Sequence, residues 1–120
     1  MRFCHVTLTV KDMDASIRFY TEVVGLPIVS RYQAGAGMEI AFLGEGETKV
    51  ELICNANSYN AVVGSAMSIG FEVESVPDKL NCLKHCGVPT VSDIVQPNAS
   101  VRFFYAADPD GFRVQFLEHM

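Results

Sequence analysis

Residues 5–17, HVTLTVKDMDASI, and residues 68–80, SIGFEVESVPDKL, follow the same plan. Each begins with alternating apolar and polar residues, which is typical of a strand with one buried face. A capping residue and a helical pattern of apolar residues come next, with Asp12 as the cap in the first stretch and Ser75 or a neighbour in the second. A glycine and then a proline close both helical patterns. The two stretches lie 63 residues apart, and the matches in register indicate an internal duplication.

The likeness continues beyond the helical patterns. Each half has three further strand-like runs. In the second half the turn sequence DPDG precedes the last run. The runs are PIVSRY (27–32), MEIAFLG (38–44) and KVELIC (49–54) in the first half, and TVSDIV (90–95), VRFFYA (101–106) and FRVQFLE (112–118) in the second. This order predicts an α+β fold of two tandem βαβββ modules, at about 1–57 and 66–120. Because a module of this size buries little surface alone, we expect one domain over residues 1–120, with the two sheets forming a curved, half-open barrel.

Composition narrows the class of protein. The 120 residues are 49% hydrophobic and 19% charged, which is typical of a globular domain. The net charge of −5 argues against nucleic acid and anionic membranes as partners. No apolar run approaches the roughly 20 residues that span a bilayer, and the N-terminus lacks the layout of a signal peptide, so we expect a cytoplasmic protein. We expect the four cysteines to be buried, reduced thiols rather than a metal or redox cluster; they are Cys4, Cys54, Cys82 and Cys86.

Strand alternation assigns side chains to faces. Six apolar residues of the two first strands should lie beneath the helices: Val6, Leu8, Val10, Ile69, Phe71 and Val73. One polar residue of each first and last strand then falls on the opposite face: His5, Glu51, Ser68 and Gln115. These four residues are either a functional constellation or solvated residues of a cleft wall, and the spacing alone leaves both interpretations open.

The chain resembles the vicinal oxygen chelate superfamily, which includes glyoxalase I, bleomycin-resistance proteins, fosfomycin-resistance transferases and extradiol dioxygenases. Residues 1–27, MRFCHVTLTVKDMDASIRFYTEVVGLP, are similar to the opening of glyoxalase I. Residues 41–53, AFLGEGETKVELI, and 108–118, DPDGFRVQFLE, resemble the ends of the two modules of that family. The resemblance covers nearly the whole chain and implies paired βαβββ modules. It also implies a homodimer, because relatives of this size commonly build their clefts at a two-fold interface.

The glyoxalase I pattern implies four metal ligands, which fall on the same four polar positions. His5 and Glu51 match the pattern, whereas Ser68 and Gln115 replace a histidine and a glutamate. A serine hydroxyl is a poor ligand for Zn²⁺ or Ni²⁺, and a glutamine amide carries no charge and does not titrate. We therefore interpret His5 and Glu51 as the remnant of a metal site. We expect no resident cofactor, or at most a weakly held Zn²⁺ or Ni²⁺ ion.

Other residues are candidates for ligand binding. Arg102 could hold a ligand carboxylate, with a solvated ion pair as the alternative. His119 is a candidate backup metal ligand, because it has the strand parity of Gln115. The run RFFYA (102–106) should place at least one aromatic side chain toward the cleft, which suits an apolar or ring-bearing ligand.

Three functional hypotheses follow. The first is a small-molecule binding protein similar to the bleomycin-resistance branch, with His5, Glu51, Ser68, Gln115 and Arg102 at the ligand and without a full metal site. The second is a metal-dependent lyase or isomerase of the glyoxalase I (lactoylglutathione lyase) type with an altered ligand set, and the third is a metal-free enzyme that uses Glu51 or Glu72. If the protein is an enzyme, Glu51 is its candidate base. We favour binding or a metal-free activity over the glyoxalase I type.

Overall fold

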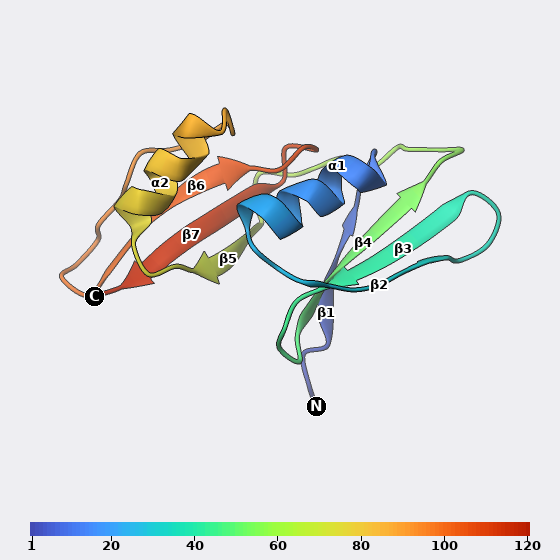
Figure 1. Cartoon of the computed structure of the whole chain (residues 1–120), viewed down its shortest axis with the longest axis horizontal. Helices are drawn as coiled ribbons and strands as arrows, with labels where there is room; N and C mark the ends of the chain where they lie inside the picture. Colours follow the sequence, from blue (N-terminus) through green and yellow to red (C-terminus); the bar gives the residue numbers. More distant parts are fainter. The chain divides into compact units, whose positions relative to one another are not determined.

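The computed structural model describes residues 1–120, and the chain forms two compact units, Met1–Val62 and Val63–Met120. Figure 1 shows both units, each with one helical segment and one sheet. The boundary falls inside the predicted join between the modules. No helix is long and apolar enough to cross a membrane. The placement of the two sheets in a half-open barrel stays a prediction.

The first unit is a βαβββ module, as the sequence predicts. Its sheet has the order β1-β4-β3-β2, in which β1 and β4 are parallel and the other pairs are antiparallel. Asp12 begins the helical segment, because its Oδ1 accepts a hydrogen bond from the Ala15 amide at 3.1 Å. Gly25, at φ +93°, follows the segment in the left-handed region that glycine adopts without strain. The elements are β1 (His5–Thr9), α1 (Met13–Arg18), the π-helical continuation η1 (Phe19–Val23), β2 (Ile28–Gln33), β3 (Met38–Leu43) and β4 (Lys49–Asn55).

The second unit repeats this plan, but its sheet has three strands where the first has four. Its sheet has the order β5-β7-β6, with β5 and β7 parallel. Ser75 caps its helix by accepting a hydrogen bond from the Asp78 amide at 3.2 Å. The elements are β5 (Ser68–Glu72), α2 (Val76–His85), β6 (Val101–Ala107) and β7 (Arg113–His119).

The strand expected at residues 90–95 is a correction to the predicted βαβββ order. This segment makes only two isolated bridges to β6, Thr90 with Ala106 and Val95 with Phe103. Between the bridges, the Ser92 hydroxyl accepts the hydrogen bond of the Tyr105 amide at 3.0 Å. A side chain therefore takes the amide that a backbone carbonyl would bind in a continuous ladder.

The first and last strands of the two modules pair in the same register. His5 stands opposite Lys49, as Ser68 stands opposite Arg113. Two residues further along, Thr7 pairs with Glu51 and Gly70 pairs with Gln115. The duplication predicted from the sequence thus extends to individual backbone pairs.

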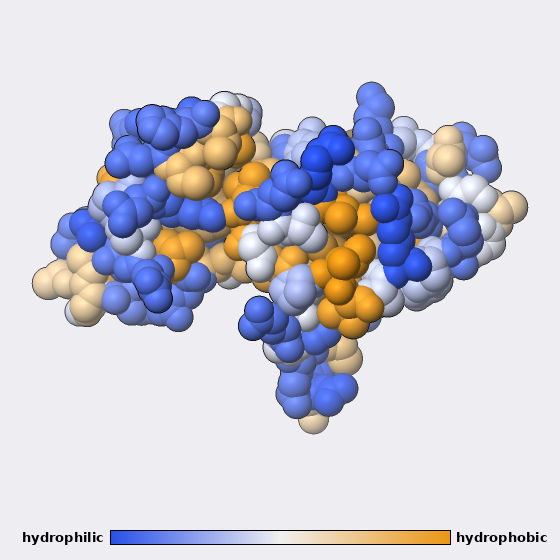
Figure 2. Space-filling model, viewed as in Figure 1, coloured by the Kyte–Doolittle hydropathy of each residue, from blue (hydrophilic) through white to orange (hydrophobic).

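The predicted core is correct for the first module and only partly correct for the second. Leu8 and Val10 are buried and Val6 is half-buried, but Ile69, Phe71 and Val73 are all only half-buried. The strand order does not explain this difference, because β1 and β5 are both edge strands with a single neighbour, and α1 packs on β4 as α2 packs on β6 and β7. Figure 2 shows hydrophilic residues over much of the visible surface, with patches of hydrophobic residues between them.

The expectation of buried cysteines is wrong, because none of the four is fully buried. Cys4, Cys82 and Cys86 are exposed, and only Cys54 is half-buried. In α2 the buried stripe consists of Val76, Leu80 and Leu83, so the two helical cysteines fall outside it. All four thiols are free, as expected.

A salt bridge fixes α2 to its sheet. Glu118 Oε2 accepts hydrogen bonds from Arg102 Nε at 2.9 Å and from the Val76 amide at 2.8 Å. The carboxylate therefore joins β6, β7 and the first turn of α2, where a negative charge is favourable. The bond from Arg102, and then that from Val76, lowers the pKa of Glu118 below its ordinary value of 4.5.

We predict that Glu118→Gln lowers the thermal midpoint at neutral pH and flattens its acid dependence. Because the folded-state pKa of Glu118 lies below the unfolded value, its stabilisation is present above pH 4.5 and is lost as the pH falls through the folded pKa. Thermal unfolding at several pH values from neutral to strongly acidic measures both effects. Glu74→Gln, at an exposed residue close to α2, is the matched control. Equal acid dependence in wild type and Glu118→Gln would contradict the prediction.

Candidate functional site

The first-module residues predicted to act together do lie together. His5 Nε2 of β1 lies 3.5 Å from Glu51 Oε1 of β4, on the face of the sheet opposite the buried Leu8 and Leu52. This separation is longer than an ordinary hydrogen bond and short enough for electrostatic attraction when the imidazole is protonated. The Glu51 side chain is 12% exposed and that of His5 is 42% exposed, so the imidazole is open to solvent above a largely covered carboxylate.

Two neighbours that the sequence analysis did not single out support this pair. The Thr7 hydroxyl donates to Glu51 Oε1 at 2.6 Å. The His5 ring stands edge-on to Phe42, with 5.7 Å between ring centroids, and Phe42 pairs with Glu51 in the β3–β4 ladder. The alternation of β1 could have identified Thr7, whereas Phe42 required the register between β3 and β4. The carboxylate is thus held in place by a hydroxyl and stands beside an apolar ring.

The second module presents different chemistry in the same frame. Ser68 is exposed, and Gln115 Nε2 donates to the Tyr105 hydroxyl at 3.3 Å. Gly70 takes the place that Thr7 occupies in the first module, and a Cβ there would lie 3.0 Å from Gln115 Oε1. The glycine therefore makes room for the amide, where the first module has a hydroxyl bonded to a carboxylate.

These donors fit a divalent metal in the first module only. Imidazole and carboxylate are good ligands for Zn²⁺ or Ni²⁺, whereas a hydroxyl and a neutral amide bound to a tyrosine are poor replacements. No group of three or more histidine, cysteine, aspartate or glutamate side chains that could hold a metal ion gathers in the structure. The complete four-ligand set of the glyoxalase I pattern does not fit this chain.

Arg102 lies on a different face from the other candidates. In the β6–β7 ladder Tyr105 pairs with Gln115 and Arg102 pairs with Glu118, so Arg102 belongs to the face covered by α2. Its bonds to Glu118 raise the pKa of its guanidinium. Of the two alternatives left by the sequence, the ion pair is the one that the structure contains, and we omit Arg102 from the proposed site.

His119 and Glu72 form a separate contact. His119 Nδ1 bonds Glu72 Oε2, and both residues share the strand parity of Gln115. Both side chains are 65% exposed. A solvated pair of this kind is worth little to stability.

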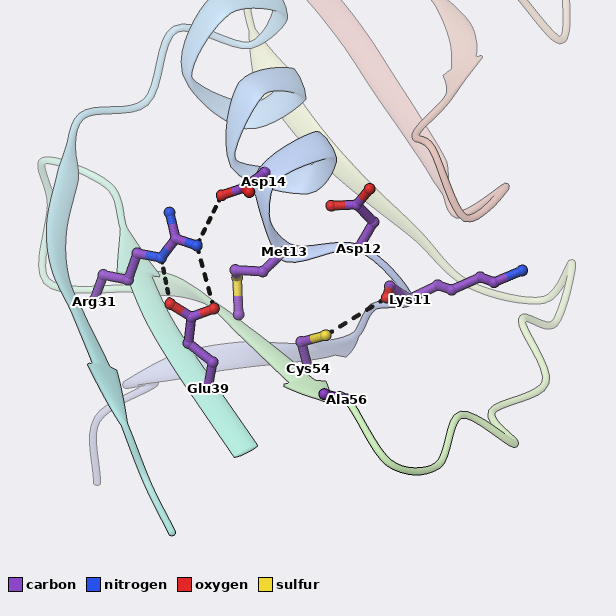
Figure 3. A pocket seen from close by; sticks show the side chains of 8 residues that line it. All are labelled: Lys11, Asp12, Met13, Asp14, Arg31, Glu39, Cys54 and Ala56. Carbon is purple, nitrogen blue, oxygen red and sulfur yellow. Dashed lines mark hydrogen bonds and ion pairs between the residues drawn. The ribbon is translucent and has the colours of Figure 1, made fainter. Parts of the chain in front are cut away.

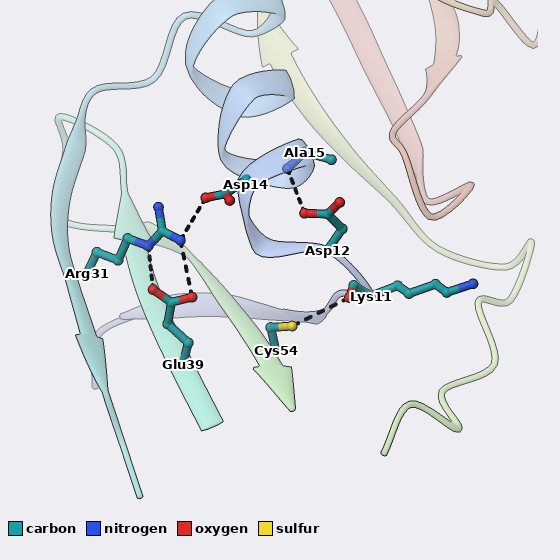
Figure 4. A network of polar contacts seen from close by, with 7 residues as sticks. All are labelled: Lys11, Asp12, Asp14, Ala15, Arg31, Glu39 and Cys54. Carbon is teal, nitrogen blue, oxygen red and sulfur yellow. Dashed lines mark hydrogen bonds and ion pairs between the residues drawn. The ribbon is translucent and has the colours of Figure 1, made fainter. Parts of the chain in front are cut away.

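A pocket of about 570 Å³ lies on the opposite side of the first-module sheet, next to the start of α1 (Figure 3). Its lining includes Glu39 and Cys54, which pair in the β3–β4 ladder on the face opposite Glu51. Arg31 spans Glu39 and Asp14 across this pocket, as Figure 4 shows. The bonds to Glu39 and then to Asp14 raise the pKa of Arg31, and none of the predicted site residues lines the pocket.

Comparisons with known proteins agree with the resemblance. The profile of the Glyoxalase/Bleomycin resistance protein/Dioxygenase superfamily matches residues 2–116, and the chain belongs to this superfamily. The Bacillus subtilis protein YwbC is 30% identical to this chain over 98% of it and 97% of its own length. A lactoylglutathione lyase of Neisseria meningitidis is 26% identical over 98% of this chain and 91% of its own length. The structure of glyoxalase I from Leishmania major superposes with a TM-score of 0.81 at 28% identity, covering 98% of this chain and 86% of that one.

We predict that the double variant Ser68→His with Gln115→Glu binds Zn²⁺ or Ni²⁺ at least about tenfold more tightly than wild type, because it restores two imidazoles and two carboxylates. Binding should weaken at low pH, since the histidines must lose a proton to ligate. Isothermal titration calorimetry measures both effects.

Adding His5→Ala to the double variant is the control, and it should weaken binding again. A folded double variant that binds metal no better than wild type would show that the four positions do not act on one ion.

Proposed function

We propose that this protein binds a small organic molecule on the polar faces of its sheets, at His5, Glu51, Ser68 and Gln115, without the full metal site of glyoxalase I. The observation that carries the proposal is the contrast between Glu51 and Gln115. Both occupy the same register position, but one is a carboxylate supported by Thr7 and the other is an amide that donates to Tyr105. An amide cannot accept a proton near neutral pH, so the second module supports recognition better than catalysis.

The surroundings of the two polar groups suit a ligand with an apolar part. Phe42 lies beside the His5–Glu51 pair, and Tyr105 contacts Phe103 edge-on at 5.7 Å between ring centroids next to Gln115. Aromatic walls with a few polar groups are the usual composition of small-molecule sites. Any metal held by His5 and Glu51 alone would be bound weakly.

A metal-dependent lyase or isomerase of the lactoylglutathione lyase type is the second candidate. It is favoured by the 3.5 Å approach of His5 to Glu51 and by the lactoylglutathione lyases among the relatives. In a metal-free enzyme, the third hypothesis of the sequence analysis, Glu51 would be the base.

We also propose that the protein is a homodimer. The edge strand β2 exposes Ile28, Val29 and Tyr32, at 47%, 57% and 47%, and an exposed apolar edge favours association with another chain. A closed two-fold pair is the commonest assembly for such a chain.

Native mass spectrometry of protein purified without chelator tests these proposals together. We expect a dimer mass and no stoichiometric divalent metal. We also expect added mass from a bound organic molecule, either retained through purification or bound again after a metabolite mixture is added. Glu51→Gln should reduce the retained fraction, because it removes the charge of the first-module pair.

An assay with the hemithioacetal of methylglyoxal and glutathione separates the second candidate. We expect no turnover, with or without added Zn²⁺ or Ni²⁺. Turnover that requires one bound metal per chain and disappears in His5→Ala would replace the binding proposal by the lyase. In the mass-spectrometry experiment, Glu45→Gln, in an exposed turn before β4, is the matched control for Glu51→Gln.

A further inference from the structure

Arg113 occupies a defined place beside the second-module half of the proposed site. It pairs with Ser68 across the β5–β7 ladder and with Ala107 across the β6–β7 ladder. It precedes Gln115 by two residues on the same strand, so both side chains emerge on the same face. The sequence analysis did not single it out, although the alternation of β7 assigns it to this face.

The guanidinium of Arg113 has no carboxylate partner. The structure pairs Arg102 with Glu118 and Arg31 with Asp14 and Glu39, but it contains no ion pair for Arg113. Instead its guanidinium carbon lies 5.4 Å from the centre of the Tyr105 ring. Arg113 is half-buried, so it differs from an arginine that extends freely into solvent.

The equivalent position of the first module has a cation that is already bonded. Lys49 stands opposite His5, as Arg113 stands opposite Ser68, and its Nζ donates to the Gly46 carbonyl in the preceding turn. The two modules therefore differ in the availability of this charge. Only the second presents a cation with its hydrogen-bonding capacity unused.

The neighbours of Arg113 favour a planar anion. A guanidinium held over an aromatic ring presents its N–H groups in a plane, which matches the two oxygens of a carboxylate. The Tyr105 ring is itself held by the bond between its hydroxyl and Gln115. Ala107, which pairs with Arg113 in the β6–β7 ladder, has only a methyl group as its side chain.

We propose that Arg113 is the anchor for a carboxylate of the ligand, and that the ligand is therefore a small organic acid with a ring or other apolar part. The carboxylate pairs with the guanidinium, the Ser68 hydroxyl donates a further hydrogen bond, and the apolar part lies against Tyr105 and Phe103. This assignment rests on the proposed function, because it requires the ligand to bind on this face.

The test is a titration of the full-length ¹⁵N-labelled protein, followed by NMR, with three probes that share one ring: benzoate, benzamide and phenyl phosphate. We expect benzoate to shift the resonances of β5 and β7. We expect benzamide, which lacks the charge, to bind wild type at least about tenfold more weakly than benzoate does. Benzoate should bind Arg113→Gln at least about tenfold more weakly than wild type, because a charge-assisted pair is lost in each case. Arg113→Lys, which keeps the charge but not the planar pairing, should fall between Arg113→Gln and wild type. Arg18→Gln, at an exposed arginine of α1, is the control and should bind as wild type.

Each contrary result has one meaning. Equal binding of benzoate and benzamide, or of benzoate to wild type and Arg113→Gln, overturns the role of Arg113 and leaves the proposed function standing. Tighter binding of phenyl phosphate than of benzoate overturns the carboxylate as the anion. If none of the three probes shifts resonances on either sheet face, the anchor fails. If a metabolite mixture also shifts none, the proposed function fails with it.

Discussion

The parallel pairing of the first strand with the last strand is the constraint on which each module depends. Parallel strands need a long crossover between them, and here the helix and the intervening strands supply it. The register of this pair also decides which residues meet. In the first module it sets His5 beside Glu51. In the second module the same offset relates Ser68, at the position equivalent to His5, to Gln115. The site chemistry therefore follows from a backbone relation that both modules share.

Within this shared frame the two modules have diverged in charge. The first holds a carboxylate on a hydroxyl, beside an imidazole, and its nearby lysine is bonded to a turn carbonyl. The second holds a neutral amide on a tyrosine, and its arginine has no anionic partner. One module thus presents negative charge and the other presents positive charge. In a symmetric metal site, by contrast, each module would contribute an imidazole and a carboxylate.

The sequence predicted what depends on short-range alternation. The faces of His5 and Glu51, the caps at Asp12 and Ser75, and the end of the first helix at Gly25 all follow from local patterns, and the structure contains them. The sequence failed where the answer depends on pairing between strands. The apolar pattern of residues 90–95 favoured a strand, but it could not reveal that the Ser92 hydroxyl takes a backbone amide of β6. The half-burial of Phe71 also lies outside the local pattern, because alternation in β5 predicts which face the side chain joins and not how closely that face is covered.

The two arginines of the second-module sheet show why register matters for assigning function. Arg102 and Arg113 are both half-buried and both stand in strands near Gln115. Because Tyr105 pairs with Gln115, Arg102 falls on the helix face, where it bonds Glu118. Glu118 also accepts a hydrogen bond from the Val76 amide in the first turn of α2. Arg113 falls on the polar face, where no carboxylate of the protein neutralises it. The Tyr105 ring gives this guanidinium a cation–π contact but no anionic partner, and a ligand anion would supply that partner. Strand parity thus separates an arginine that is paired with Glu118 from one that has no anionic partner.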